Sequence, residues 1–261
     1  MDKGTLLDRL GSTGDERLLL AHVLDKLDQT ERRNIPSCTD FLSPQEQARS
    51  RDLLRLAGTE AYTLSGGYEG AERKLLLFVP DWQQTEDAIF PLRCLRASFR
   101  AEYQLTHRDI LGSLMGLGIV REKVGDLLVG EEGCDIVVAD SIADFLLQNW
   151  TSAGRAALKV TEVTPDCLHM PVERCEDYRD TVSSLRLDAV ASTGFRMSRG
   201  KAAALIEGGK VQVNWRDCVK PDHLLSAGDT VTARGLGKFV LAEVGGVTKK
   251  GRTSIVVRRW L

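Results

Sequence analysis

Residues 185–214 read LRLDAVASTGFRMSRGKAAALIEGGKVQVN, and this stretch decides the fold of the C-terminal part of the chain. Apolar residues recur at helical spacing up to Gly194, where a helix can end. Ser198 then occupies the N-cap position of a second helix over residues 199–207, which two glycines end. The last four residues alternate as a strand. The stretch therefore predicts two short helices joined by a four-residue turn and followed by a sheet.

The turn and the second helix also gather positive charge. Four cations lie close together in the sequence: Arg196, Arg199, Lys201 and Lys210. Such side chains, and the free N–H groups at a helix N-terminus, donate to phosphate oxygens. Residues 182–261 hold 14 Lys+Arg against 6 Asp+Glu, a net charge of +8, whereas residues 1–181 hold 21 against 31, a net charge of −10. The formal charge of −2 thus averages two opposite segments, and the basic one is expected to bind a polyanion.

Two more strands are expected after this stretch, over residues 230–233 and 239–244. The connection between them is Arg234-Gly235-Leu236-Gly237-Lys238, which adds two cations on flexible backbone. We therefore include Arg234 and Lys238 among the candidate phosphate contacts.

The order of these residues resembles the RNA-binding domain named after protein four of the small ribosomal subunit, the S-four (S4) domain. The resemblance is carried by Arg186-Leu187-Asp188, Ser198-Arg199, Ala203, Leu205-Ile206, Gly209, Val211-Gln212-Val213-Asn214 and Gly228-Asp229. In that family the two helices and the following strand form an RNA-facing corner. The resemblance therefore implies RNA contacts by Arg186, Ser198, Arg199, Lys201, Lys210 and Asn214.

Trp215 departs from the S4 pattern, because most members carry Gly after the Asn. The departure puts the usual tight turn in doubt and leaves two interpretations open: the ring stacks on a base, or it packs against the hairpin. The complete set of candidate RNA-binding residues is Arg186, Arg196, Ser198, Arg199, Lys201, Lys210, Asn214, Trp215, Arg234 and Lys238.

The upstream sequence predicts further domains. The N-terminal segment, 1–60, is expected to be helical, and Ser43-Pro44 is a typical helix start. The elements expected next are strands over residues 75–79 and 92–99, a helix over 106–118, a hairpin of 124–129 with 134–139, a helix over 141–150 and a strand over 158–163. This order predicts a small central α/β sandwich, with helices on one face of a mostly antiparallel sheet.

The chain as a whole is predicted to be α+β, ending in an S4 domain with a small antiparallel sheet. We expect four segments: a helical N-terminal domain (1–70), the α/β sandwich (71–165), a linker (166–181) and the S4 domain (182–261). Residues 71–181 carry a net charge of −7, and of the strands at 75–79, 124–129 and 134–139 only the first offers an aromatic residue, Phe78. The central domain is therefore interpreted as a scaffold or a contact for a protein partner.

A second resemblance covers most of the chain and is weakest over the N-terminal helical segment. Its motifs are residues 117–126 (LGIVREKVGD), Val213-Asn214-Trp215, residues 234–239 (RGLGKF) and residues 248–252 (TKKGR). They are similar to bacterial and plastid YlmH-type proteins, which share the Trp after Asn. The resemblance implies a helical N-terminal region, a central domain of the ferredoxin-like (RNA-recognition-like) fold and a C-terminal S4 domain. It also implies binding to the large ribosomal subunit, with contacts to ribosomal RNA and tRNA, in the rescue of stalled translation.

An RNA-modifying enzyme is the alternative class. Arg186-Leu187-Asp188 superficially resembles the catalytic Asp motif of pseudouridine synthases, but the chain that follows Asp188 is too short for that enzyme's sheet. A methyltransferase needs a Gly-rich loop after a strand, whereas the glycines of residues 112–118 lie in and after a helix. The four histidines have no nucleophile and acid at a recognisable spacing. We therefore expect a non-enzymatic protein without catalytic residues or a cofactor.

The cysteines and the apolar runs give expectations about metal and location. Six cysteines are scattered without a Cys-x-x-Cys pair, as is usual in a reduced cytosol. Cys167, His169 and Cys175 come nearest to a zinc set but lack a fourth ligand, so no metal is expected. No signal or transit peptide is seen, and no apolar run approaches the ~20 residues that span a bilayer. We expect a cytoplasmic protein, or one of the plastid stroma in a photosynthetic eukaryote, without membrane contact.

Overall fold

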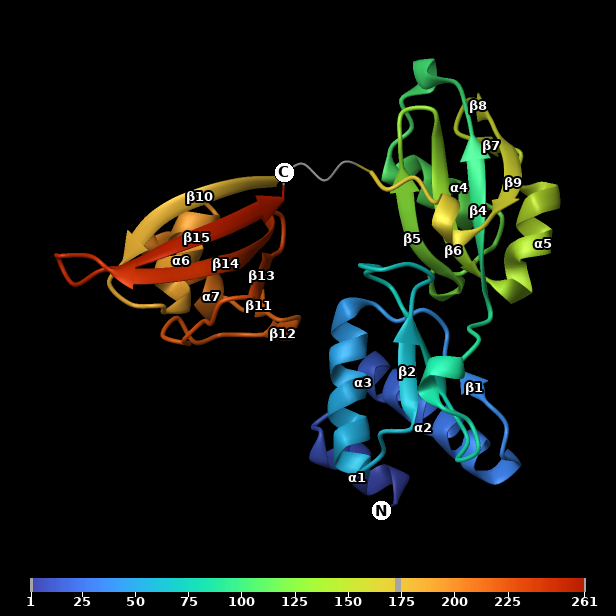
Figure 1. Ribbon diagram of the computed structural model, residues 1–261, viewed down its shortest axis with the longest axis horizontal. Helices are drawn as coiled ribbons and strands as arrows, with labels where there is room; N and C mark the ends of the chain where they lie inside the picture. The colour runs from blue at the N-terminus through green and yellow to red at the C-terminus, as the bar shows by residue number, and fades with distance from the viewer. Residues whose placement is uncertain (1, 172–174, 261) are drawn as a thin grey trace. The chain divides into compact units, whose positions relative to one another are not determined.

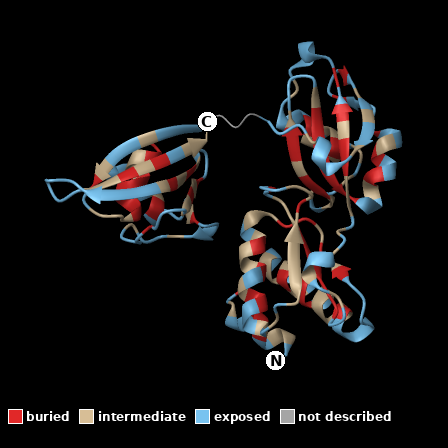
Figure 2. Cartoon of the chain, viewed as in Figure 1, coloured by how far each residue is buried: buried red, intermediate tan, exposed pale blue. Residues whose placement is uncertain are grey.

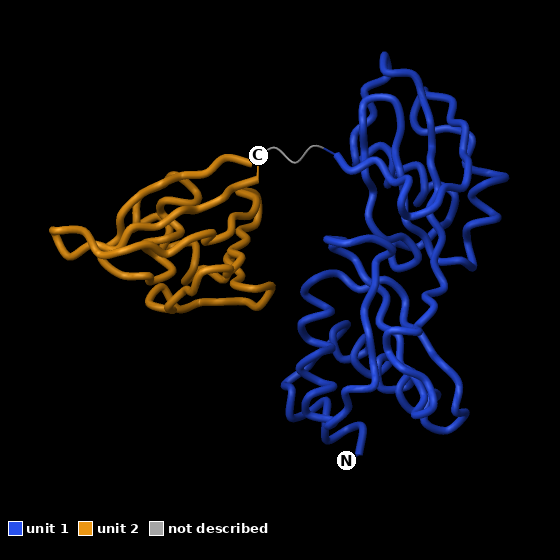
Figure 3. The backbone as a smooth tube through the Cα atoms, viewed as in Figure 1, with its two compact units in different colours: residues 1–171 blue, residues 172–261 orange. Residues whose placement is uncertain are grey.

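The computed structural model describes residues 2–171 and 175–260. The chain forms two compact units, residues 1–171 and residues 172–261 (Figure 1, Figure 3). Each unit has buried cores of its own, drawn red in Figure 2. Helices and antiparallel sheets occur in both units, which confirms the α+β class.

Three helices build the N-terminal part of the first unit: α1 (Lys3–Arg9), α2 (Gly14–Arg33) and α3 (Pro44–Ala57). The start of α3 is fixed by a capping box. The Ser43 hydroxyl accepts from the Glu46 N–H, and the Glu46 carboxylate accepts from the Ser43 N–H at 2.6 Å. The helical N-terminal region is thus confirmed.

A three-stranded antiparallel sheet accompanies these helices, in the order β1 (Ser37–Cys38), β3 (Leu75–Phe78), β2 (Tyr62–Ser65). All four residues of β3 are buried; Leu76 and Phe78 join the helical core, while Leu75 contacts the neighbouring domain. The assignment of residues 75–79 to the ferredoxin-like domain is therefore wrong. A short apolar run buried on both faces has no periodicity that identifies its partners.

The remaining elements of the unit follow the predicted ferredoxin-like order. They are β4 (Leu92–Ser98), α4 (His107–Gly116), β5 (Val124–Val129), β6 (Gly133–Ala139), α5 (Asp140–Asn149) and β9 (Lys159–Val163), with a small hairpin of β7 (Ser152–Ala153) and β8 (Ala156–Ala157). The sheet order is β5-β6-β4-β9, and every neighbouring pair is antiparallel. Helices α4 and α5 share one core with the same face of this sheet. Short 3-10 turns also occur in residues 2–171: η1 (Thr85–Asp87), η2 (Ala101–Tyr103), η3 (Arg121–Lys123) and η4 (Pro165–Cys167).

The opposite face of the central sheet is covered as well. Phe41 packs over Gly125 so closely that an added Cβ there would lie 2.9 Å from the ring. Asp135, on β6, accepts from Arg96 at 2.6 and 2.7 Å and from the His169 N–H at 2.6 Å. Leu168 packs against the buried apolar cluster that contains Phe41. The N-terminal domain and the segment after β9 thus shield the face that is usually open in RNA-recognition folds.

The described residues of the second unit, 175–260, form one antiparallel sheet with two helices. Its elements are β10 (Cys175–Val182), α6 (Leu187–Gly194), α7 (Arg199–Glu207), β11 (Val211–Val213), β12 (Arg216–Asp217), β13 (Thr230–Ala233), β14 (Gly237–Val247) and β15 (Thr253–Trp260). The strand order is β10-β15-β14-β13-β11-β12. Helix α6 approaches the sheet closely at Gly194, where an added Cβ would lie 2.4 Å from the Phe239 ring.

Strand β10 corrects the predicted linker of residues 166–181. Residues 172–174 lie outside the described residues, but Cys175–Val182 pair with β15 along the whole strand. Four of the eight side chains of β10 are charged, and only Val182 is buried. An edge strand tolerates such charges, so the segment has the composition of a linker although it forms part of the sheet.

Candidate nucleic-acid interface

The turn between α6 and α7 presents Arg196 in a left-handed backbone conformation. The Met197 N–H donates to the carbonyl of Ser192 at 3.0 Å, and the Arg196 N–H donates to that of Thr193 at 3.2 Å. This is the Schellman motif, in which glycine is usual at the left-handed position. Arg196 occupies that position with φ of 53°. Its guanidinium lies over the ring of Tyr178 in β10, 5.5 Å from the ring centroid.

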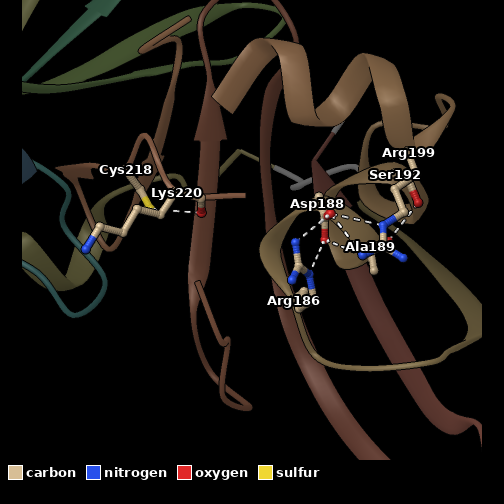
Figure 4. A network of polar contacts seen from close by, with 7 residues as sticks. All are labelled: Arg186, Asp188, Ala189, Ser192, Arg199, Cys218 and Lys220. Atoms are coloured by element: carbon tan, nitrogen blue, oxygen red, sulfur yellow. Dashed lines mark hydrogen bonds and ion pairs between the residues drawn. The ribbon is translucent and has the colours of Figure 1, made fainter. Parts of the chain in front are cut away.

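Asp188, in the first turn of α6, holds two of the candidate RNA contacts in ion pairs (Figure 4). Its carboxylate accepts from Arg186 at 3.2 and 3.3 Å and from Arg199 at 3.0 and 3.1 Å. The Asp188 side chain is 7% exposed, against 37% for Arg186 and 48% for Arg199. The two arginines therefore join the segment before α6 to the start of α7, and each keeps an exposed edge.

This arrangement fixes the charge state of Asp188. Burial acts to raise its pKa, but the hydrogen bonds from Arg186 and Arg199 outweigh burial and hold the pKa below the ordinary value of a carboxyl group. The group is consequently ionised at neutral pH. In this structure Asp188 thus holds two arginines in place.

Lys201 and Lys210 are the candidates most available to a ligand. Both are exposed, and neither side chain has an ion pair or hydrogen bond with any residue that the structure describes. Lys201 lies in the first turn of α7, and its N–H donates to the N-cap hydroxyl of Ser198 at 3.4 Å. Lys210 follows α7, and its carbonyl accepts from the N–H of Arg234 at 3.2 Å. Lys210 and Arg234 thus lie at the same end of the sheet.

Asn214 and Trp215 form the two-residue turn between β11 and β12. Their φ angles are 49° and 61°, and Val213 pairs with Arg216 across the turn. Two successive positive φ values define a type I′ turn, which prefers Asn-Gly. The tight turn is therefore retained with Trp in the glycine position, where the left-handed conformation costs about 1–2 kcal/mol. Trp215 is 36% exposed at the hairpin tip.

Two further candidates, Asn214 and Lys238, also contact other residues of the second unit. The Asn214 amide donates to Asp229 at 2.8 Å and its oxygen accepts from the Thr230 N–H at 3.0 Å. Lys238 lies over the ring of Trp260, 5.1 Å from its centroid. Asn214 thus positions the turn, and the Lys238 ammonium is held against an aromatic ring.

Some residues of this surface were missed by the sequence analysis. Residues 243–252 of the β14–β15 hairpin are all exposed and carry three cations, Lys249, Lys250 and Arg252. Arg252 donates to the carbonyl and the hydroxyl of Thr181, which anchors the hairpin to β10. The basic turn TKKGR could have indicated these cations. No local signal could have found Tyr178, because its place depends on the pairing of β10 with β15.

Among residues 2–171 and 175–260, no three His, Cys, Asp or Glu side chains are grouped so that they could hold a metal ion. Cys167 and Cys175 are both exposed free thiols. Within the same described ranges, every helix is too short or too polar to cross a membrane.

Comparisons with known proteins agree with this architecture. Three family models match in chain order: the N-terminal domain of YlmH over residues 15–81, the putative RNA-binding domain in YlmH over residues 90–166 and the S4 domain over residues 185–231. The ribosome-associated protein quality control protein P2 of Bacillus subtilis (strain 168) is 33% identical over 246 residues, which are 94% of this chain and 95% of that protein.

A solved structure, the cell division protein ylmH from Streptococcus pneumoniae, is 26% identical, with a TM-score of 0.47, over 58% of this chain and 93% of that chain. The B. subtilis relative matches almost the entire chain, and the three domain models follow one another in the order of the folded domains. This chain therefore belongs to the YlmH family of RNA-binding proteins.

Proposed function

We propose that this protein binds ribosomal RNA, and also tRNA, on the large ribosomal subunit, as a non-enzymatic cytoplasmic factor in the quality control of stalled translation. The observation that carries the proposal is the α6–α7 corner of the S4 domain. There the Lys201 ammonium has no partner among the described residues, and the two arginines that bind Asp188 keep exposed edges. The name of the B. subtilis relative supports a place on the ribosome. The net charge of +8 on residues 182–261 supports a polyanionic ligand.

The first unit is proposed to contact a protein partner. Its central domain matches a model described as a putative RNA-binding domain. RNA-recognition sheets stack bases on strand aromatics, but the described strands β4 (LRCLRAS) and β6 (GCDIVVA) carry none, and Phe41 and Leu168 cover part of that face. Base stacking on this sheet is therefore not part of the proposal.

Reversing the charge of Lys201 and Lys210 tests the proposal directly. The double variant Lys201→Glu/Lys210→Glu breaks no ion pair within the described residues, so its fold should be unchanged. We expect its affinity for purified large subunits to fall roughly 10- to 100-fold, and the slope of log affinity against log salt to decrease by about two. Co-sedimentation at several salt concentrations measures both quantities.

The matched control changes the same charge in the first unit. Arg33 and Arg51 are exposed and have no ion pair with a described residue. The variant Arg33→Glu/Arg51→Glu should bind like the wild type. Equal losses in both double variants would mean that net charge, rather than the α6–α7 corner, determines binding.

A third variant concerns Trp215. The change Trp215→Gly places the preferred residue in the type I′ turn, so we expect the free energy of unfolding to stay the same or to rise by up to about 1 kcal/mol. Because base stacking on an aromatic contributes about 1–3 kcal/mol, affinity for the subunit should fall about tenfold. Urea unfolding and co-sedimentation separate the two effects. Full affinity in the glycine variant would show that the ring serves packing alone.

The non-enzymatic part of the proposal has its own test. Mass spectrometry of ribosomal RNA from cells lacking the protein should show every modification that the parent strain carries. A missing modification that the restored gene returns would contradict this part and favour an RNA-modifying enzyme.

A further inference from the structure

A shallow depression of about 590 Å³ opens on the second unit between β10, the C-terminal end of α6, the α6–α7 turn and the start of α7. This volume is within the range of small-ligand sites, about 300–1,000 Å³. Strand β10 precedes the part of the chain that matches the S4 domain model, residues 185–231. The depression is therefore made jointly by the S4 corner and by a strand outside the S4 motif.

Its walls carry a cation–π pair. The guanidinium of Arg196 lies over the Tyr178 ring, and the Tyr178 hydroxyl donates to the Glu176 carboxylate. The contact with Tyr178 holds Arg196 in the wall of the depression, and an arginine guanidinium can stack on a further planar group. The backbone adopts a left-handed conformation at Arg196, φ 53°, to place the side chain there.

The rest of the depression is polar and held in place. Asp180 of β10 accepts from the hydroxyl of Thr193 at 2.9 Å, which ties the edge strand to α6. Lys201 and the Ser198 hydroxyl lie at the side formed by α7. The site thus offers a cationic plane for stacking and, beside it, an ammonium group and a hydroxyl group that suit a phosphate.

We propose that this depression holds one unpaired nucleotide of RNA. The base stacks on the Arg196 guanidinium, and the adjoining phosphate binds Lys201 and Ser198. Bases within a duplex are stacked on each other and present no free face, whereas bulges and loops can splay a base onto an arginine plane. The site therefore selects bulged or looped RNA over a continuous duplex. This inference rests on the proposed function, because it assumes that the S4 corner binds RNA.

The test compares an RNA duplex with the same duplex carrying a bulge whose central base is the fluorescent adenine analogue 2-aminopurine. The full-length protein should bind the bulged RNA about tenfold more tightly than the paired RNA, and binding should quench the 2-aminopurine emission because the base becomes stacked. Titrations followed by anisotropy and by emission give the two readouts.

Arg196→Gly is the decisive variant, because glycine suits the left-handed position of the Schellman motif and the fold should be kept. It should lose the preference for the bulge and the quenching. Tyr178→Phe should keep both, and Tyr178→Leu should weaken both, as expected of a positioning residue. If Arg196→Gly preserves the preference and the quenching, the inference is wrong.

The outcomes also separate this inference from the proposed function. Equal wild-type affinity for the two RNAs, with both affinities lowered by Lys201→Glu/Lys210→Glu, would overturn the nucleotide site while supporting RNA binding at the corner. Failure of the wild type to bind either RNA or the large subunit would overturn both.

Discussion

Replacing Asp188 by Asn is expected to lower the free energy of unfolding of the second unit by about 2–3 kcal/mol at pH 7. The substitution keeps the size of the side chain but removes the charge that Arg186 and Arg199 share. Breaking a buried ion pair from one side costs about 3–5 kcal/mol, and the partial exposure of both arginines places this case lower. Pulse proteolysis across a urea series, read from peptides of each unit, measures the loss.

A matched Asp–Arg pair on the surface provides the control. Asp177 of β10 accepts from Arg258 at 2.8 and 3.0 Å, but these side chains are 42% and 48% exposed. Asp177→Asn should change stability little, because exposed pairs are screened by water. A similar loss in both variants would show that the burial of Asp188 does not set its contribution.

The effect of Asp188 should also depend on pH. Its pKa is depressed in the folded state, so its contribution is complete above the unfolded pKa, near 4, and is lost as the pH falls through the lower, folded pKa. The difference in the free energy of unfolding between wild type and Asp188→Asn should therefore shrink as the pH is lowered below about 4. A difference that is constant from pH 7 to pH 3 would contradict an ionised Asp188.

The fold could be predicted where local rules determine it. Ser43 with Glu46, the Schellman turn after α6 and the Asn-containing hairpin all depend on neighbours in sequence. The partners of β3 and β10 could not be predicted in this way. Strand β3 is apolar throughout and β10 is largely charged, so neither has a period-2 pattern, and their pairing is decided by contacts with distant strands.

The candidate site also combines features that the sequence predicts with features that depend on the tertiary structure. Its cations could be found from composition and from the S4 resemblance, but their partners could not. Arg186 and Arg199 bind Asp188, whereas Lys201 and Lys210 remain free among the described residues. Which cations are paired and which are free depends on the tertiary structure. It determines which variants test binding and which disturb the fold.

Backbone strain adds an argument for function. Five non-glycine residues in the described ranges have positive φ, and three of them, Arg196, Asn214 and Trp215, belong to the candidate surface. Asn tolerates this conformation, but Arg and Trp occupy positions that favour glycine. Because strained residues cluster at functional sites, Arg196 and Trp215 join the exposed Lys201 and Lys210 as candidates for direct RNA contact.

A second large loss of stability is expected in the first unit. Asp135→Asn should lower its free energy of unfolding by about 3 kcal/mol, because the Asp135 side chain is 2% exposed and binds Arg96 twice. It also accepts from the His169 N–H, and an uncharged amide oxygen accepts more weakly than a carboxylate, so the segment after β9 should be held less firmly on the sheet. The urea series used for Asp188 measures the stability.

The reactivity of the Cys94 thiol shows whether the segment after β9 still covers the sheet. Its thiol is buried in the cluster that Leu168 covers, and burial, followed by the charge of Asp135, raises its pKa to about 11. In Asp135→Asn both causes weaken, so more thiolate forms, and alkylation by iodoacetamide at pH 8 should accelerate at least about tenfold. Cys134, buried on the helix-facing side of the same sheet, should stay protected. If Cys94 reacts as slowly as in the wild type, Leu168 and Phe41 cover the sheet without help from Asp135.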